Sequence, residues 1–160
     1  MRRLLQCLLL VLLGGAILGC GPPRKSVFPP QVSIQQLMVQ PDGQWQLTLR
    51  IQNNSYAGMD FTALSGQLRI GKEIPVRLHA TFKRSIPELA GDVISLVVLP
   101  TANMSQALQA IAAKGSAGAL EYQISGSVTA TPEQAKKPQD FPFHGNEWLS
   151  PVPGIANTYR

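Results

Sequence analysis

The most regular feature of this chain is an alternation of hydrophobic and polar residues in two of its segments. In 45–52 the apolar side chains fall at the odd positions, and in 74–82 they fall at the even positions. A period of two is typical of an antiparallel strand with one face in the core and the other in solvent. We therefore predict a strand in each segment, with Leu78 in the core and Arg77 in solvent.

Five further segments have the composition of strands. They are rich in β-branched and aromatic residues, and turn residues such as those of 41–43 separate them. These segments are 32–39, 61–70, 93–99, 120–130 and 141–145. The nearly continuous apolar run of 93–99 predicts a buried strand. Gly66 suggests a bulge or kink in the strand that contains it.

One segment has helical periodicity instead. Apolar residues in 104–113 recur three and four positions apart, and Lys114-Gly115 follows as a stop signal. Ser105 or Asn103 could cap the start of this helix. About seven strands and one short helix, with turns at the spacing of a β-sandwich, predict an all-β domain.

The first twenty residues follow another pattern. Two arginines precede an apolar run, and residues 17–20 read Ile-Leu-Gly-Cys. A membrane-spanning helix needs about 20 apolar residues, and this run is shorter. A cleaved signal peptide fits better. An ordinary signal peptide would be cut after a small residue such as Ala16 or Gly19.

Residues 17–20 also resemble the lipobox of bacterial lipoproteins. The resemblance implies that residues 1–19 are removed, that the Cys20 thiol receives a diacylglycerol, and that the new amine is acylated, typically with palmitate. Two or more acyl chains hold a protein stably at a membrane. In such lipoproteins an aspartate after the cysteine usually signals retention in the inner membrane. Gly21 therefore favours the outer membrane of a bacterial envelope, with the domain facing the periplasm.

These patterns divide the chain into four parts. A removed signal peptide (1–19) precedes lipidated Cys20 and a proline-rich tether that ends at residue 31. The sandwich is expected to span 32–149, and a loose tail to span 150–160. An extended tether of this length would reach roughly 30 Å at most.

Composition narrows the classes of function. Of the two cysteines, Cys7 would leave with the signal peptide and Cys20 would carry the lipid, so the mature chain should form no disulfide. The formal net charge of +5 includes the two arginines of the signal peptide. The remaining basic residues are dispersed and form no stripe interleaved with aromatics, so we expect no nucleic-acid partner. Arg24-Lys25 could attract anionic lipid headgroups weakly.

A series of short motifs runs through the predicted sandwich. The first is the strand 45–51 running into Asn53-Asn54, and the others are 64–71, 86–89, 120–126 and 141–145. From about residue 28 to residue 149, these motifs resemble the late-embryogenesis-abundant (LEA) type 2 family, which has the water-stress and hypersensitive-response (WHy) domain. The family usually has Asn-Pro where this chain has Asn53-Asn54. The resemblance implies a fibronectin-III/immunoglobulin-like antiparallel sandwich with a helix between two late strands. It also implies a role in desiccation or osmotic stress tolerance, and it assigns no catalytic residue.

The residues themselves suggest no catalytic, metal or cofactor site. His79 falls on the polar face of its strand, and His144 is expected to be partly packed and neutral. The chain has no Cys/His cluster for a metal, no strained Gly-x-Ser-x-Gly turn, and only scattered carboxylates. Trp148, beyond the last predicted strand, either covers one end of the sandwich or forms an exposed contact.

We therefore expect a protein that is not an enzyme and has no cofactor other than the covalent lipid on Cys20. Its expected function is binding or protection at the envelope, with the membrane and exposed envelope or client proteins as partners. The alternative is a structural module of a periplasmic assembly that accepts a strand of another chain at a sheet edge.

Overall fold

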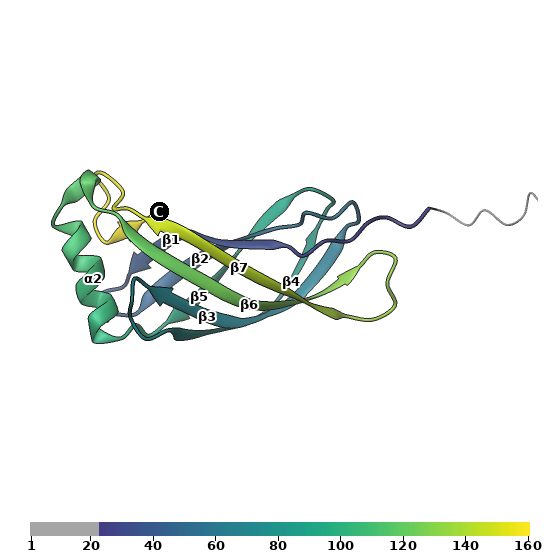
Figure 1. Ribbon diagram of the computed structural model, residues 1–160, viewed down its shortest axis with the longest axis horizontal. Coiled ribbons are helices and arrows are strands. Elements are labelled where there is room, and N and C mark those ends of the chain that lie inside the picture. Colours follow the sequence, from purple (N-terminus) through teal and green to yellow (C-terminus); the bar gives the residue numbers. More distant parts are fainter. Residues whose placement is uncertain (1–22) are drawn as a thin grey trace, which may run out of the picture.

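A computed structural model describes residues 23–160. The expected signal peptide (1–19) and the expected lipidation site, Cys20, lie outside the described residues. Two antiparallel sheets of four strands each pack face to face, and one helix closes an end of the sandwich (Figure 1). Within residues 23–160, the expected all-β sandwich with one short helix is therefore confirmed, with eight strands instead of about seven.

The first sheet has the strand order β5-β2-β1-β8, and the second has the order β4-β3-β6-β7. The strands are β1 (Gln31–Val39), β2 (Trp45–Gln52), β3 (Met59–Ile70), β4 (Val76–Ile86), β5 (Gly91–Val98), β6 (Leu120–Pro132), β7 (Gln139–Leu149) and β8 (Thr158–Tyr159). Between β5 and β6 lie α2 (Ala102–Ala112) and a short 3-10 helix, η2 (Gly115–Ala117).

The core lies between the two sheets, where the alternating apolar residues meet. Trp45 and the apolar residues that alternate with it along β2 are fully buried. Leu78 is buried and Arg77 is exposed, as the alternation in 74–82 predicts. That strand starts later than predicted, because Ile74 lies in the preceding turn with 76% of its surface exposed.

Two predicted strands differ from the observed ones. The run 93–99 was predicted to be a buried strand, but β5 is an edge strand, and Val97 and Leu99 are exposed. An apolar run alone cannot distinguish a central strand from an edge strand. The last predicted strand, 141–145, is part of the longer β7, which includes Trp148 as an exposed residue.

Gly66 marks a close approach of two strands instead of a bulge. It pairs directly with Gly126 of β6, and the bulge of β3 lies between Phe61 and Ala63. A Cβ on Gly126 would fall on the Ser65 carbonyl oxygen and 2.5 Å from the Gly66 Cα. The two glycines therefore let the backbones of β3 and β6 approach at the centre of the sheet.

The helix is capped differently from the prediction. Neither Ser105 nor Asn103 is the cap, since the Met104 N–H donates to Thr101 Oγ1 at 3.2 Å. Thr101 has an extended backbone, as an N-cap requires. Met104, Leu108 and Ile111 are buried, so α2 covers one open end of the core.

The expectation of a loose tail over 150–160 was wrong. Thr158 and Tyr159 form β8 against β1, and both are buried. Ser150 and Arg160 also exchange backbone hydrogen bonds. The tail is fixed because Tyr159 gives it an apolar group to bury and because β1 offers it an unpaired edge.

Candidate functional site

The end of the sandwich opposite α2 is formed by segments that are far apart in the sequence (Figure 1). They are the N-terminal segment 23–30 and the loops 53–58, 87–90 and 133–138. We call this the anchor-proximal end, because the expected lipid anchor, Cys20, precedes the first described residue by only three positions.

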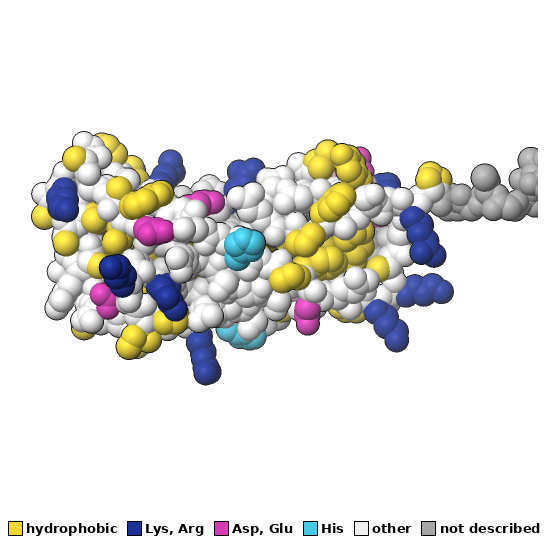
Figure 2. Space-filling model, viewed as in Figure 1, with side chains coloured by type: hydrophobic (Ala, Val, Ile, Leu, Met, Phe, Trp, Pro, Cys, Tyr) yellow, Lys and Arg dark blue, Asp and Glu magenta, His cyan; other side chains and the backbone are white. Residues whose placement is uncertain are grey.

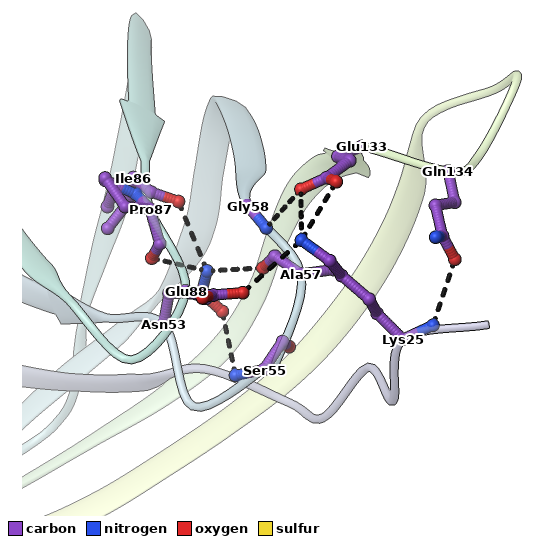
Figure 3. Close-up of polar contacts among 10 residues, drawn as sticks. All are labelled: Lys25, Asn53, Ser55, Ala57, Gly58, Ile86, Pro87, Glu88, Glu133 and Gln134. Carbon is purple, nitrogen blue, oxygen red and sulfur yellow. Dashed lines mark hydrogen bonds and ion pairs between the residues drawn. The ribbon is translucent and has the colours of Figure 1, made fainter. Parts of the chain in front are cut away.

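Asn53 holds two of these loops together (Figure 3). Its side-chain amide donates to the carbonyl oxygens of Ala57 at 2.9 Å, Ile86 at 3.2 Å and Pro87 at 2.9 Å. Its carbonyl oxygen accepts a bond from the Ser55 N–H at 2.9 Å. Asn53 is fully buried, and its bonds to Ala57, Ile86 and Ser55 satisfy buried backbone groups.

The N-terminal segment is docked on the same loops. The Phe28 N–H donates to Ser55 Oγ at 2.9 Å, and Ser55 Oγ donates back to the Phe28 carbonyl at 3.1 Å. The Tyr56 N–H donates to the Ser26 carbonyl at 3.0 Å. Ser55 is itself buried, so the segment is bonded to a rigid part of the domain.

Lys25 is the first docked residue (Figure 3). Its ammonium lies 3.0 Å from Glu133 and 3.4 Å from Glu88, and its backbone N–H donates to Gln134 at 3.0 Å. The hydrogen bond that the Lys25 ammonium donates to Glu133 raises the pKa of Lys25. The same bond, followed by the one that the Gly58 N–H donates, lowers the pKa of Glu133. Because these groups are exposed, the ion pairs contribute little to the free energy of unfolding. Their main effect is to fix the position of the N-terminal segment.

This docking shortens the expected tether. The sequence suggested a spacer that continued to residue 31, but residues 25–29 are hydrogen-bonded to the domain. Only residues 21–24 separate Cys20 from Lys25. At ~3.6 Å per residue, the five steps from Cys20 to Lys25 span about 18 Å at most.

Apolar side chains are exposed at this end. The exposed fractions are 38% for Val27, 46% for Phe28, 56% for Tyr56 and 58% for Leu89. The Phe28 and Tyr56 rings meet edge to face, with centroids 6.3 Å apart. Leu89 has a φ of 55°, in the left-handed region that disfavours a branched side chain. A glycine or asparagine would suit that turn better, so the exposed leucine is held there at a backbone cost.

Basic side chains lie at the same end as these apolar groups. Arg24, Lys136 and Lys137 are exposed in the segments that form the end. Among residues 23–160, the ion pairs that form are Lys25 with Glu88, Lys25 with Glu133, and Arg84 with Asp92, so these three cations take part in none. Figure 2 shows Lys and Arg side chains at the end where the N-terminal trace leaves, with hydrophobic side chains beside them.

A second candidate region is an open trough of about 570 Å³ on the outer face of the β4-β3-β6-β7 sheet. Ser65, Gln67 and Ser125 form its floor, and Arg77 and His79 of β4 form one wall.

His144 is exposed on β7, which corrects the expectation that it is partly packed. β3 and β6 lie between the strands of the two histidines, so their Cα atoms are at least roughly 14 Å apart.

Within residues 23–160, no three His, Cys, Asp or Glu side chains gather closely enough to hold a metal ion. Over the same described range, no helix has both the length and the apolar character needed to cross a membrane. The arrangement at the anchor-proximal end is suited to surface contact, because it combines exposed apolar groups with cations that form no ion pair.

A buried tyrosine links the two sheets outside these regions. Tyr122 Oη accepts a bond from the Ile34 N–H at 2.9 Å and donates to Glu147 Oε2 at 2.9 Å. Burial raises the pKa of Tyr122, and the bond to Glu147 raises it further. Since β8 reaches β1 only at Leu37 and Met38, the phenol satisfies a backbone donor that β8 leaves unpaired.

The sequence did not indicate the roles of three residues at this end, which are Asn53, Lys25 and Leu89. Asn53 could have been found, because it continues the inward-facing odd positions of 45–51. The partners of Lys25 lie 63 and 108 positions away, so no local pattern indicates them. Nor does any local pattern indicate the left-handed backbone of Leu89.

Comparison with known proteins adds structural neighbours only. The sequence matches no protein-family model and no curated protein. A protein from Archaeoglobus fulgidus is similar at a TM-score of 0.44 and 8% identity, covering 79% of this chain and 98% of its own. A protein from Arabidopsis thaliana is similar at a TM-score of 0.46 and 8% identity, covering 86% and 87%. A structural-genomics target, SoR45, is similar at a TM-score of 0.46 and 10% identity, covering 79% and 89%. Scores and identities of this size carry no information on function.

Proposed function

We propose that this chain is a bacterial lipoprotein, anchored through Cys20 to the outer membrane, whose periplasmic domain binds or shields other molecules during desiccation or osmotic stress. The observation that supports the anchor is the position of Cys20, at the end of a signal-like segment and five residues before docked Lys25. A lipid on Cys20 would therefore hold a rigid domain within about 18 Å of the bilayer.

The proposed activity is contact without catalysis. The outer trough offers hydroxyl, amide and guanidinium groups in an open polar surface, which suits weak and varied contacts with exposed molecules. A membrane-bound domain also acts at high effective concentration on whatever lies at that surface. The association with water loss comes from the LEA type 2 and WHy resemblance.

One observation favours the alternative, a structural module of a periplasmic assembly. β5 is an edge strand, its only charged residue is Asp92, and Val97 is exposed on it. Proteins usually protect such edges with charges, prolines or bulges. A partner strand could add to β5 by backbone pairing. Val97→Lys should then abolish a stoichiometric partner in crosslinked membranes, whereas the protective function would tolerate this change.

The protective function is tested by survival. A deletion strain should survive drying or hyperosmotic shock less well than its parent, and the wild-type gene should restore survival. Cys20→Ser behind a secretory signal should restore less, because dilution lowers the concentration of the domain at the membrane. Equal survival of deletion strain and parent under both stresses would contradict the protective function and favour the assembly module.

A further inference from the structure

We infer that the anchor-proximal end is a membrane-contact surface, which seats the domain end-on against a bilayer that contains anionic lipids. This inference rests on the proposed anchor at Cys20 and adds an orientation to it. The surface consists of Val27, Phe28, Tyr56 and Leu89 as apolar contacts and Arg24, Lys136 and Lys137 as cations.

The combination of exposed apolar and basic side chains indicates that this surface binds a lipid bilayer. Amphipathic surfaces that bind bilayers place aromatic and aliphatic groups at the headgroup boundary and cations among anionic headgroups. A basic residue near such a surface contributes about fivefold to binding. Glu88 and Glu133, which lie at the same end, are paired with Lys25. Their charges therefore oppose the attraction less than unpaired carboxylates would.

The position of the anchor distinguishes this end from the other exposed apolar groups. Among the described residues, the other exposed large apolar side chains lie on or near the end that carries α2. They are Ile74, Val97, Leu99, Trp148 and Ile155. A strand of twelve residues such as β3 separates the two ends by about 40 Å. The chain toward Cys20 leaves from the anchor-proximal end alone, so only this end is brought to the headgroups in an upright orientation.

Leu89 supplies an independent indication. Its left-handed backbone disfavours leucine, yet the side chain is 58% exposed and fills no core position. A strained residue with no packing role in the domain is expected where it serves a contact outside the domain. Within residues 23–160 the other non-glycine residue with positive φ is Asn157, a residue type that tolerates this conformation.

The orientation can be measured on the full lipidated chain in vesicles of phosphatidylethanolamine and phosphatidylglycerol. Because Cys7 leaves with the signal peptide and Cys20 is blocked by lipid, a single new cysteine can carry a nitroxide label. Phe28→Cys and Tyr56→Cys probe the proposed contact, Ile74→Cys probes the opposite end, and His79→Cys probes the outer face. The readout is the ratio of collision rates with oxygen and with a water-soluble nickel complex.

We expect this ratio to be several-fold higher at positions 28 and 56 than at positions 74 and 79. Lys136→Glu with Lys137→Glu should reduce the fraction of protein in contact by about tenfold or more. The matched control, Lys72→Glu with Lys114→Glu, makes the same charge change at the opposite end and should have little effect. Leu89→Gly should also reduce contact, and because glycine adopts the observed φ, the domain should remain folded.

The outcomes separate the inference from the proposed function. A lipidated chain with equally water-exposed labels at positions 28, 56 and 74 would overturn the contact surface and leave the anchor standing. A high ratio at position 79 with a low ratio at position 28 would mean that the domain lies on its outer face, which also overturns the inference. A chain that carries no lipid would contradict the proposed function itself.

Discussion

Replacing Asn53 by alanine is expected to lower the free energy of unfolding by about 4 kcal/mol, since four backbone groups, most of them buried, lose a hydrogen bond at once. The change would leave the carbonyl oxygens of Ala57, Ile86 and Pro87 without the amide that now donates to them. It would also remove the acceptor of the Ser55 N–H. Each buried polar group left unsatisfied costs roughly 1–3 kcal/mol, and water can reach only some of the groups after relaxation.

The neighbouring residue provides a matched control. Asn54 is exposed, and its side chain makes one long bond of 3.4 Å to the Pro29 carbonyl. Asn54→Ala should therefore change the free energy of unfolding by less than about 0.5 kcal/mol. Urea denaturation followed by circular dichroism measures both variants. Equal midpoints for the two variants would mean that Asn53 does not hold the two loops together.

Gly126→Ala is expected to cost about 3 kcal/mol, because its methyl group would meet backbone atoms that cannot rotate away. The new Cβ would fall on the Ser65 carbonyl oxygen and 2.5 Å from the Gly66 Cα. To make room, β3 and β6 would have to separate at the centre of their sheet. The thermal midpoint of unfolding should fall by about 10 °C for a domain of this size.

Gly58→Ala is the control for this substitution. A Cβ there would lie 3.4 Å from Glu133 Oε2, at an ordinary contact distance, and Gly58 does not have positive φ. We expect a change within about 1 kcal/mol. If Gly126→Ala and Gly58→Ala changed the free energy of unfolding equally, β3 and β6 would not approach closely at Gly66 and Gly126.

The alternation of residue types was sufficient to predict most of the sandwich, because one face of each strand must be buried. It placed Leu78 in the core and Arg77 in solvent correctly. It could not tell that β5 lies at an edge, since neighbours in a sheet are set by the order of strands and not by the composition of one. The two-residue β8 was missed because its pairing with β1 depends on the burial of Tyr159.

The anchor-proximal end was less accessible to sequence reasoning. Its bonds join Lys25 to Glu133 and Phe28 to Ser55, and such long-range pairs leave no periodic signal. Proline-rich composition suggested an extended spacer, and residues 25–29 are indeed without regular structure. Composition did not indicate that backbone and side-chain bonds would fix this segment to three separate loops.

Mass spectrometry of the mature N-terminus, on protein extracted from the membrane fraction of a bacterium that expresses the full chain, tests whether Cys20 is the lipid anchor. We predict a chain that begins at Cys20 and carries a diacylglycerol on its thiol and an acyl group on its amine. Cys20→Ala should remain unprocessed and without lipid. A mature chain cut after Ala16 or Gly19 with an unmodified Cys20 would contradict the lipoprotein anchor and, with it, the proposed function at the membrane.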